Sequence, residues 1–113
     1  TGALGAPFVG VWNNLKLQPF LDRIAIRPEG SHLAVQIDFE TDACVGGFTG
    51  SAHYDSAQQA WIALPPPEEK SDCVITLQRQ GAALRVQETP ACLDYHGVAC
   101  NFEGDFTRRT DPP

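Results

Sequence analysis

Three side chains near the C-terminal end of the chain have the types and spacing of metal ligands. Cys92, His96 and Cys100 recur every fourth residue, with Asp94 between them. Thiolate and imidazole are ligands that zinc prefers in proteins. A fourth ligand is not evident, and oxidised cysteines cannot bind zinc as thiolates. We therefore predict no metal site and no cofactor, and we expect these cysteines in disulfides.

The four cysteines form an even set that contains no CxxC pair, which favours two disulfides. Sequence alone leaves all of their pairings open. Cys92 and Cys100 are close enough to bracket one loop, so the favoured pairing joins Cys92 to Cys100 and Cys44 to Cys73. In the chain-entropy model these loops contribute about 2 to 3 and about 3 to 4 kcal/mol, respectively. Disulfides indicate an oxidising compartment, and we expect a periplasmic or secreted protein.

Common catalytic motifs are missing from the sequence. It contains no GxSxG, no HExxH and no glycine-rich phosphate loop. The histidines, His32, His53 and His96, lie far apart along the chain, and we interpret them as partly exposed surface residues. We therefore predict that the protein is not an enzyme.

An acidic row occupies every second residue at Asp38, Glu40 and Asp42. This spacing puts the three carboxylates on the solvent face of one strand. Solvation is the usual role of such a row, and the alternatives are a calcium site or a surface that faces a cationic protein.

Composition limits the class of protein and of partner. The 113 residues are 42% hydrophobic and 19% charged, which is typical of one globular domain covering residues 1–113. The net charge of −6 makes nucleic acid an unfavourable partner and a basic protein a favourable one. No apolar run approaches the roughly 18 residues of a membrane helix, and no export leader is present, so we expect a soluble mature form with no membrane span.

The elements that must position these side chains are strands. Residues 33–39 alternate between apolar and polar types, residues 24–26 do the same, and a turn sequence at 28–31 joins them as a hairpin. Residues 47–54 and 60–64 form a second such pair, and residues 75–79 and 84–88 form a third around Gly81, which can adopt positive φ. Residues 8–13 and 99–108 complete eight strands.

Eight short strands favour a small antiparallel barrel, with a two-sheet sandwich as the alternative, because closure leaves no sheet edge. The proline run in residues 65–70 cannot join a ladder and should form a stiff, solvated connection between the fifth and sixth strands.

Gly10-Val11-Trp12 resembles the GxW at the start of the first strand in lipocalin-like barrels. That resemblance implies that Trp12 packs in the floor of the barrel. It also raises the alternative of a carrier, in which an apolar ligand enters a mouth near Trp12, Trp61 or Tyr54.

A second resemblance lies in residues 49–54, TGSAHY, followed after six residues by Trp61. This stretch resembles the Ser/Gly/Ala-rich segment, ending in tyrosine, of membrane-bound and periplasmic lysozyme inhibitors, which are eight-stranded barrels. The resemblance implies a loop that enters the lysozyme cleft, where Ser51 offers its hydroxyl to the catalytic carboxylates and Tyr54 supports the loop. His53 stands where that family usually has a basic residue. The implied partner-binding residues are Thr49, Ser51, His53 and Tyr54.

Residues 92–108 are similar to the C-terminal end of small secreted bacterial proteins. Together these patterns predict a non-catalytic secreted or periplasmic binding protein, with inhibition of a basic hydrolase such as lysozyme as the leading hypothesis. A lipocalin-like carrier and a structural or antigenic envelope protein are the alternatives. An open apolar cavity would favour the carrier, and a filled core with a protruding segment at 49–54 would favour the inhibitor.

Overall fold

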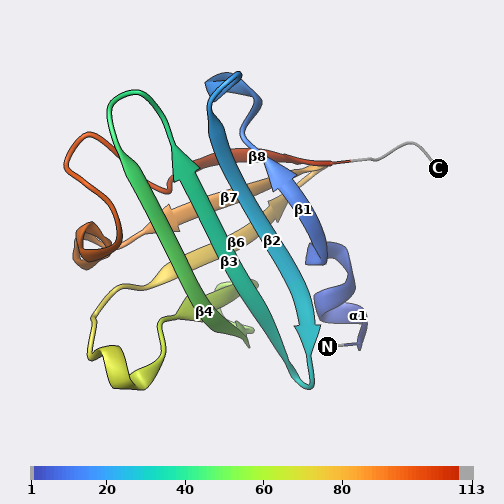
Figure 1. Cartoon of the computed structure of the whole chain (residues 1–113). Helices are drawn as coiled ribbons and strands as arrows, with labels where there is room; N and C mark the ends of the chain where they lie inside the picture. Colours follow the sequence, from blue (N-terminus) through green and yellow to red (C-terminus); the bar gives the residue numbers. More distant parts are fainter. Residues whose placement is uncertain (1, 110–113) are drawn as a thin grey trace.

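The computed structural model describes residues 2–109 and contains a closed antiparallel barrel of eight strands (Figure 1). Each strand pairs with the next along the chain, and β8 closes the barrel on β1. The strands are β1 Gly10–Asn13, β2 Leu21–Glu29, β3 His32–Glu40, β4 Val45–Asp55, β5 Ala60–Leu64, β6 Ile75–Gln80, β7 Ala83–Glu88 and β8 Gly104–Arg108. The helical segments are α1 Gly2–Gly5 and the 3₁₀ turns η1 Ala6–Phe8, η2 Leu15–Leu17, η3 Pro67–Glu69 and η4 Pro90–Tyr95. The barrel expected from the two-residue periodicity is confirmed.

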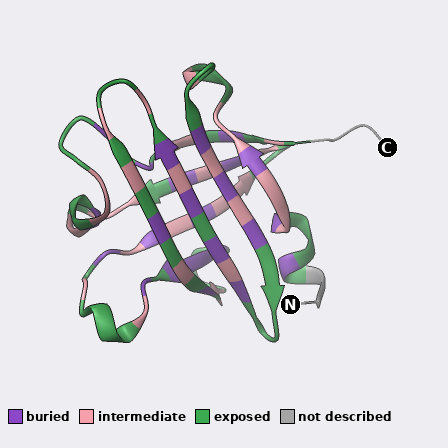
Figure 2. Cartoon of the chain, viewed as in Figure 1, coloured by how far each residue is buried: buried purple, intermediate pink, exposed green. Residues whose placement is uncertain are grey.

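All three predicted hairpins are present as β2–β3, β4–β5 and β6–β7. In the first hairpin Ile24 pairs with Ile37, so the apolar positions of both strands share the interior face. Figure 2 shows the resulting alternation of buried and exposed residues along β2, β3 and β4. Gly81 has the predicted positive φ, at 59°.

The first and last strands are shorter than predicted. β1 starts at Gly10 because the preceding residues form η1, and β8 starts at Gly104 rather than near residue 99. The alternation in residues 99–103 does not produce a ladder. Instead Cys100 is tied into a disulfide, and the Phe102 backbone N–H donates to the Glu88 carboxylate.

Side chains fill the interior of the barrel. The largest fully buried side chains are Trp12, Trp61, Phe102 and Phe106. The two indoles are satisfied by the N-terminal segment, because Trp12 Nε1 donates to the Phe8 carbonyl at 3.0 Å and Trp61 Nε1 donates to the Leu4 carbonyl at 3.1 Å. This segment therefore closes one end of the barrel.

The opposite end carries the four longer connections, residues 14–20, 41–44, 65–74 and 89–103, and is called the long-connection end below. The favoured disulfide pairing is wrong here: Cys44 pairs with Cys100, and Cys73 pairs with Cys92. The physical reason is that the long 89–103 connection folds across this end: Cys92 meets the neighbouring 65–74 connection, and Gly97, three residues before Cys100, lies against the Cys44 side chain. The two disulfides close loops of 56 and 19 residues, worth about 4 and about 3 kcal/mol in the chain-entropy model.

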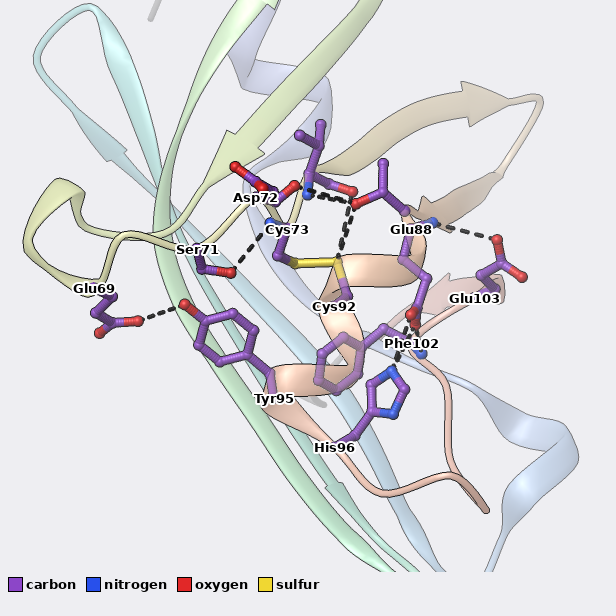
Figure 3. The surroundings of a disulfide bond; sticks show 12 residues. Glu69, Ser71, Asp72, Cys73, Glu88, Cys92, Tyr95, His96, Phe102 and Glu103 are labelled. Atoms are coloured by element: carbon purple, nitrogen blue, oxygen red, sulfur yellow. Dashed lines mark hydrogen bonds and ion pairs between the residues drawn. A yellow bond between two sulfur atoms is a disulfide. The ribbon is translucent and has the colours of Figure 1, made fainter.

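Polar contacts reinforce the Cys73–Cys92 disulfide (Figure 3). Tyr95 Oη donates to the Glu69 carboxylate at 2.6 Å, and the Val74 backbone N–H donates to Thr89 Oγ1 at 3.0 Å. Three of the four connections are thus held together covalently and by hydrogen bonds. No helix among residues 2–109 has the length and apolar character needed to cross a membrane.

Candidate functional site

The segment predicted to bind a partner lies inside β4, where alternate side chains face outward. Thr49, Ser51 and His53 are exposed, whereas Phe48 and Ala52, at the alternate positions, are buried. The resemblance to lysozyme inhibitors implies a loop at these positions, but the structure has a strand. The reason is pairing: residues 45–52 pair with β3, and residues 51–55 pair with β5.

A groove of about 450 Å³ runs over this outward face of β4. The proline run after β5 forms its other wall, because Ser51 pairs with Leu64 and the chain then turns over the strand. Its lining residues are Glu29, His32, Thr49, Gly50, Ser51, His53, Leu64, Pro65, Pro66 and Pro67. Three of the four predicted binding residues therefore gather in one groove.

Behind the groove, Gly50 allows β4 and the end of β5 to approach closely. A Cβ atom at this position would collide with the Leu64 carbonyl and lie 2.8 Å from the Phe48 ring. Only glycine fits between β4 and the end of β5 at this position, which shares the inward face of β4 with Phe48 and Ala52.

The polar groups of the groove are available for a ligand. In the described part of the chain, the hydroxyls of Thr49 and Ser51 form no hydrogen bond with another protein group. His53 lies near Asp55, whose pKa is lowered chiefly by hydrogen bonds from Gln58 and also by the charge of His53. The groove thus combines free hydroxyls and two imidazoles with an apolar wall of prolines.

Tyr54 lies on the other face of β4. Its ring is partly buried and packs edge-on against Trp61, with the centroids 5.6 Å apart. The tyrosine therefore contacts the core behind the groove and does not line the groove.

The two tryptophans proposed for a ligand mouth are core residues. Trp12 is fully buried, and the guanidinium groups of Arg79 and Arg108 lie 5.3 and 4.6 Å from its ring centroid. Trp61 is 2% exposed and packs edge-on against Phe8 at 6.4 Å. Both rings belong to the filled interior. Neither of them lines an open apolar cavity, which is the feature that would favour a carrier.

Cys92 and Cys100, two of the three side chains spaced like zinc ligands, are each oxidised with a partner outside that set. Residues 2–109 contain no group of three or more histidine, cysteine or acidic side chains arranged to hold a metal ion.

His96 was expected on the surface, and this expectation is wrong: its side chain is 4% exposed. Its Nε2 lies 2.9 Å from the carboxylate of Glu88, itself 9% exposed (Figure 3). Its Nδ1 lies 2.8 Å from the Gly97 carbonyl. The ring packs edge-on against Phe102 at 4.8 Å. This pair anchors residues 89–103 against β7.

Asp22 is a second polar residue that the sequence reasoning missed. It is 3% exposed and shares the interior face of β2 with Ile24 and Ile26. Its Oδ2 accepts a hydrogen bond from Asn14 Nδ2 at 3.1 Å, and its Oδ1 has no partner. Burial raises the pKa of Asp22 to about 6, against the lowering effect of Asn14. The two-residue periodicity of β2 could have predicted this burial, because Asp22 lies two residues before Ile24 and therefore on the same face of the strand.

Neither a protein family, nor a curated protein, nor a solved structure matches this chain.

Proposed function

We propose that this chain is a non-catalytic binding protein of an oxidising compartment, secreted or periplasmic, which docks a partner protein in the groove between β4 and the proline run. The observation that carries the proposal is the convergence of Thr49, Ser51 and His53 in that groove, with both hydroxyls unbonded. The filled interior gives no support to a carrier.

The groove is well suited to binding without rearrangement. The part of β4 at residues 51–52 is paired on both sides, so the backbone that carries Ser51 has a fixed position. Proline in the opposite wall limits the backbone freedom of the connection. A rigid site loses little conformational entropy on binding, which favours affinity.

The proposed partner is a basic hydrolase such as lysozyme. The net charge of −6 favours encounter with a basic protein at a rate that falls as salt rises. A hydroxyl that accepts and donates, as at Ser51, can bond to the carboxylates of a glycosidase cleft.

The test is a titration of this protein into lysis assays with several types of lysozyme. We expect inhibition by wild type and a loss of at least about ten-fold in affinity for Ser51→Tyr, which fills the groove. Gln87→Tyr, which places the same ring at an exposed position on β7, is the matched control and should inhibit like wild type. No inhibition at micromolar excess against any lysozyme type would refute the hydrolase proposal.

A further inference from the structure

A second cleft, away from the groove on β4, lies at the long-connection end. It measures about 440 Å³ and is lined by Pro19, Phe20, Leu21, Glu40, Thr41 and Asp42. The β1–β2 connection and the start of β2 supply an apolar side, and the end of β3 with the β3–β4 connection supplies two carboxylates. Leu21 and Glu40 pair across the strands, so the two sides have a fixed separation.

The carboxylates of this cleft are free of protein partners. The third acid of the row, Asp38, pairs with Arg23 at 3.0 Å. By contrast, within residues 2–109 the side chains of Glu40 and Asp42 take part in no ion pair and no hydrogen bond. The row found in the sequence thus divides into one neutralised and two available charges.

The apolar side of the cleft is exposed to an unusual degree. Phe20 and Leu21 are 43% and 38% exposed, although aromatic and aliphatic side chains of this size are mostly buried. They belong to a wider set, because six of the eight large hydrophobic side chains exposed among the described residues lie at this end and outside the β4 groove: Leu15, Phe20, Leu21, Val45, Leu93 and Val98. Exposed apolar side chains that gather in one region are typical of a protein contact surface.

The charge of the same end determines which partner fits. Its four connections carry six carboxylates, at Asp42, Glu68, Glu69, Asp72, Asp94 and Glu103, against Lys16 and Lys70. An acidic surface around apolar side chains complements a basic protein surface and disfavours an acidic one.

We propose that this cleft accepts an arginine or lysine side chain from the surface of a basic partner protein. Such side chains have an apolar stem and a cationic head, which match the two sides of the cleft. The stem would pack on Phe20 and Leu21, and the head would lie between Glu40 and Asp42. The site goes beyond the groove on β4 and does not depend on it.

The test uses the ¹⁵N-labelled full chain and a short triarginine peptide, with a tricitrulline peptide as the uncharged probe. We expect amide shifts centred on residues 19–21 and 40–42, which triarginine causes and tricitrulline does not. The double variant Glu40→Gln/Asp42→Asn should bind triarginine about five-fold more weakly. Phe20→Ser, which keeps both charges, should weaken binding about three-fold through loss of the apolar contact.

Glu68→Gln/Asp94→Asn is the matched control, because it removes the same charge from the same end outside the cleft. The proposal is overturned if this control weakens binding as much as the cleft variant, if tricitrulline binds equally well, or if the shifts centre on the groove at β4. Sedimentation velocity tests whether a second copy of this chain occupies the cleft instead. Self-association of the wild type that is lost in Glu40→Gln/Asp42→Asn would assign the cleft to that second copy and overturn the proposal. The groove proposal is tested separately by Ser51→Tyr, so either proposal can fail alone.

Discussion

Replacing Asp22 by asparagine should remove one component of the pH dependence of folding. The ordinary pKa of this carboxyl is 3.8, and burial raises it to about 6 in the folded chain. The folded chain therefore binds the proton more tightly than the unfolded chain. Protonation of Asp22 stabilises the fold, and this contribution is fully present below pH 3.8 and lost as the pH rises through about 6.

The difference between the two pKa values corresponds to about 3 kcal/mol in the free energy of unfolding. Asparagine has the shape of the acid but does not titrate. Its amide would leave a donor near the unpartnered Oδ1 position, which shifts the stability of the variant by a constant amount at every pH. The informative quantity is therefore the change with pH of the difference between wild type and Asp22→Asn, expected to be about 3 kcal/mol.

Urea unfolding of both proteins, from below pH 3.8 to above pH 6, measures this quantity. Wild type should lose stability relative to the variant over that interval. Asp42→Asn, which removes an exposed carboxylate, separates the effect of burial from the loss of one charge. Parallel pH curves for wild type and Asp22→Asn would refute the reasoning.

Three further outcomes are expected. Gly50→Ala should destabilise the barrel by about 2 kcal/mol, because the added methyl collides with the backbone of β5; Gly47→Ala, whose Cβ would have an ordinary 3.5 Å contact, should be mild by comparison, and equal melting temperatures for the two variants would contradict this account. His96→Ala should cost about 3 kcal/mol, because the nearly buried Glu88 carboxylate would lose its side-chain partner and keep the Phe102 backbone N–H. Denaturant unfolding beside the exposed control His32→Ala checks this, and similar losses in both would count against it. Non-reducing peptide mapping should recover the two disulfides described above, and a link between the 41–44 and 65–74 connections would overturn that pairing.

Local periodicity was sufficient to predict most of the barrel. The alternation in residues 33–39 identified both the strand and its buried face, since side chains on a strand point to opposite sides in turn. Tight turns were equally readable, because Gly81 has the positive φ that its place between two strands requires. The strands and tight turns depend on residues that are close together in the sequence, and for this reason a single sequence was enough to predict them.

The missed features depend on contacts between distant segments. Which connections stack at one end decides the cysteine pairing, and proximity in sequence wrongly favoured Cys92 with Cys100. The burial of His96 depends on its packing against Phe102 and Glu88, and no local pattern records that packing. The groove at Thr49 likewise exists only because the proline run returns over β4.

The N-terminal segment has a practical consequence for spectroscopy. Both tryptophans of the chain, Trp12 in β1 and Trp61 in β5, donate their indole N–H to carbonyl groups of residues 4–8. Detachment of those residues would expose two indoles to water while the ladder hydrogen bonds stayed intact. Tryptophan emission therefore reports whether the N-terminal segment is bound to the end of the barrel, and circular dichroism reports the amount of β-sheet. Recorded together during one thermal melt, the two signals distinguish local detachment of this segment from global unfolding.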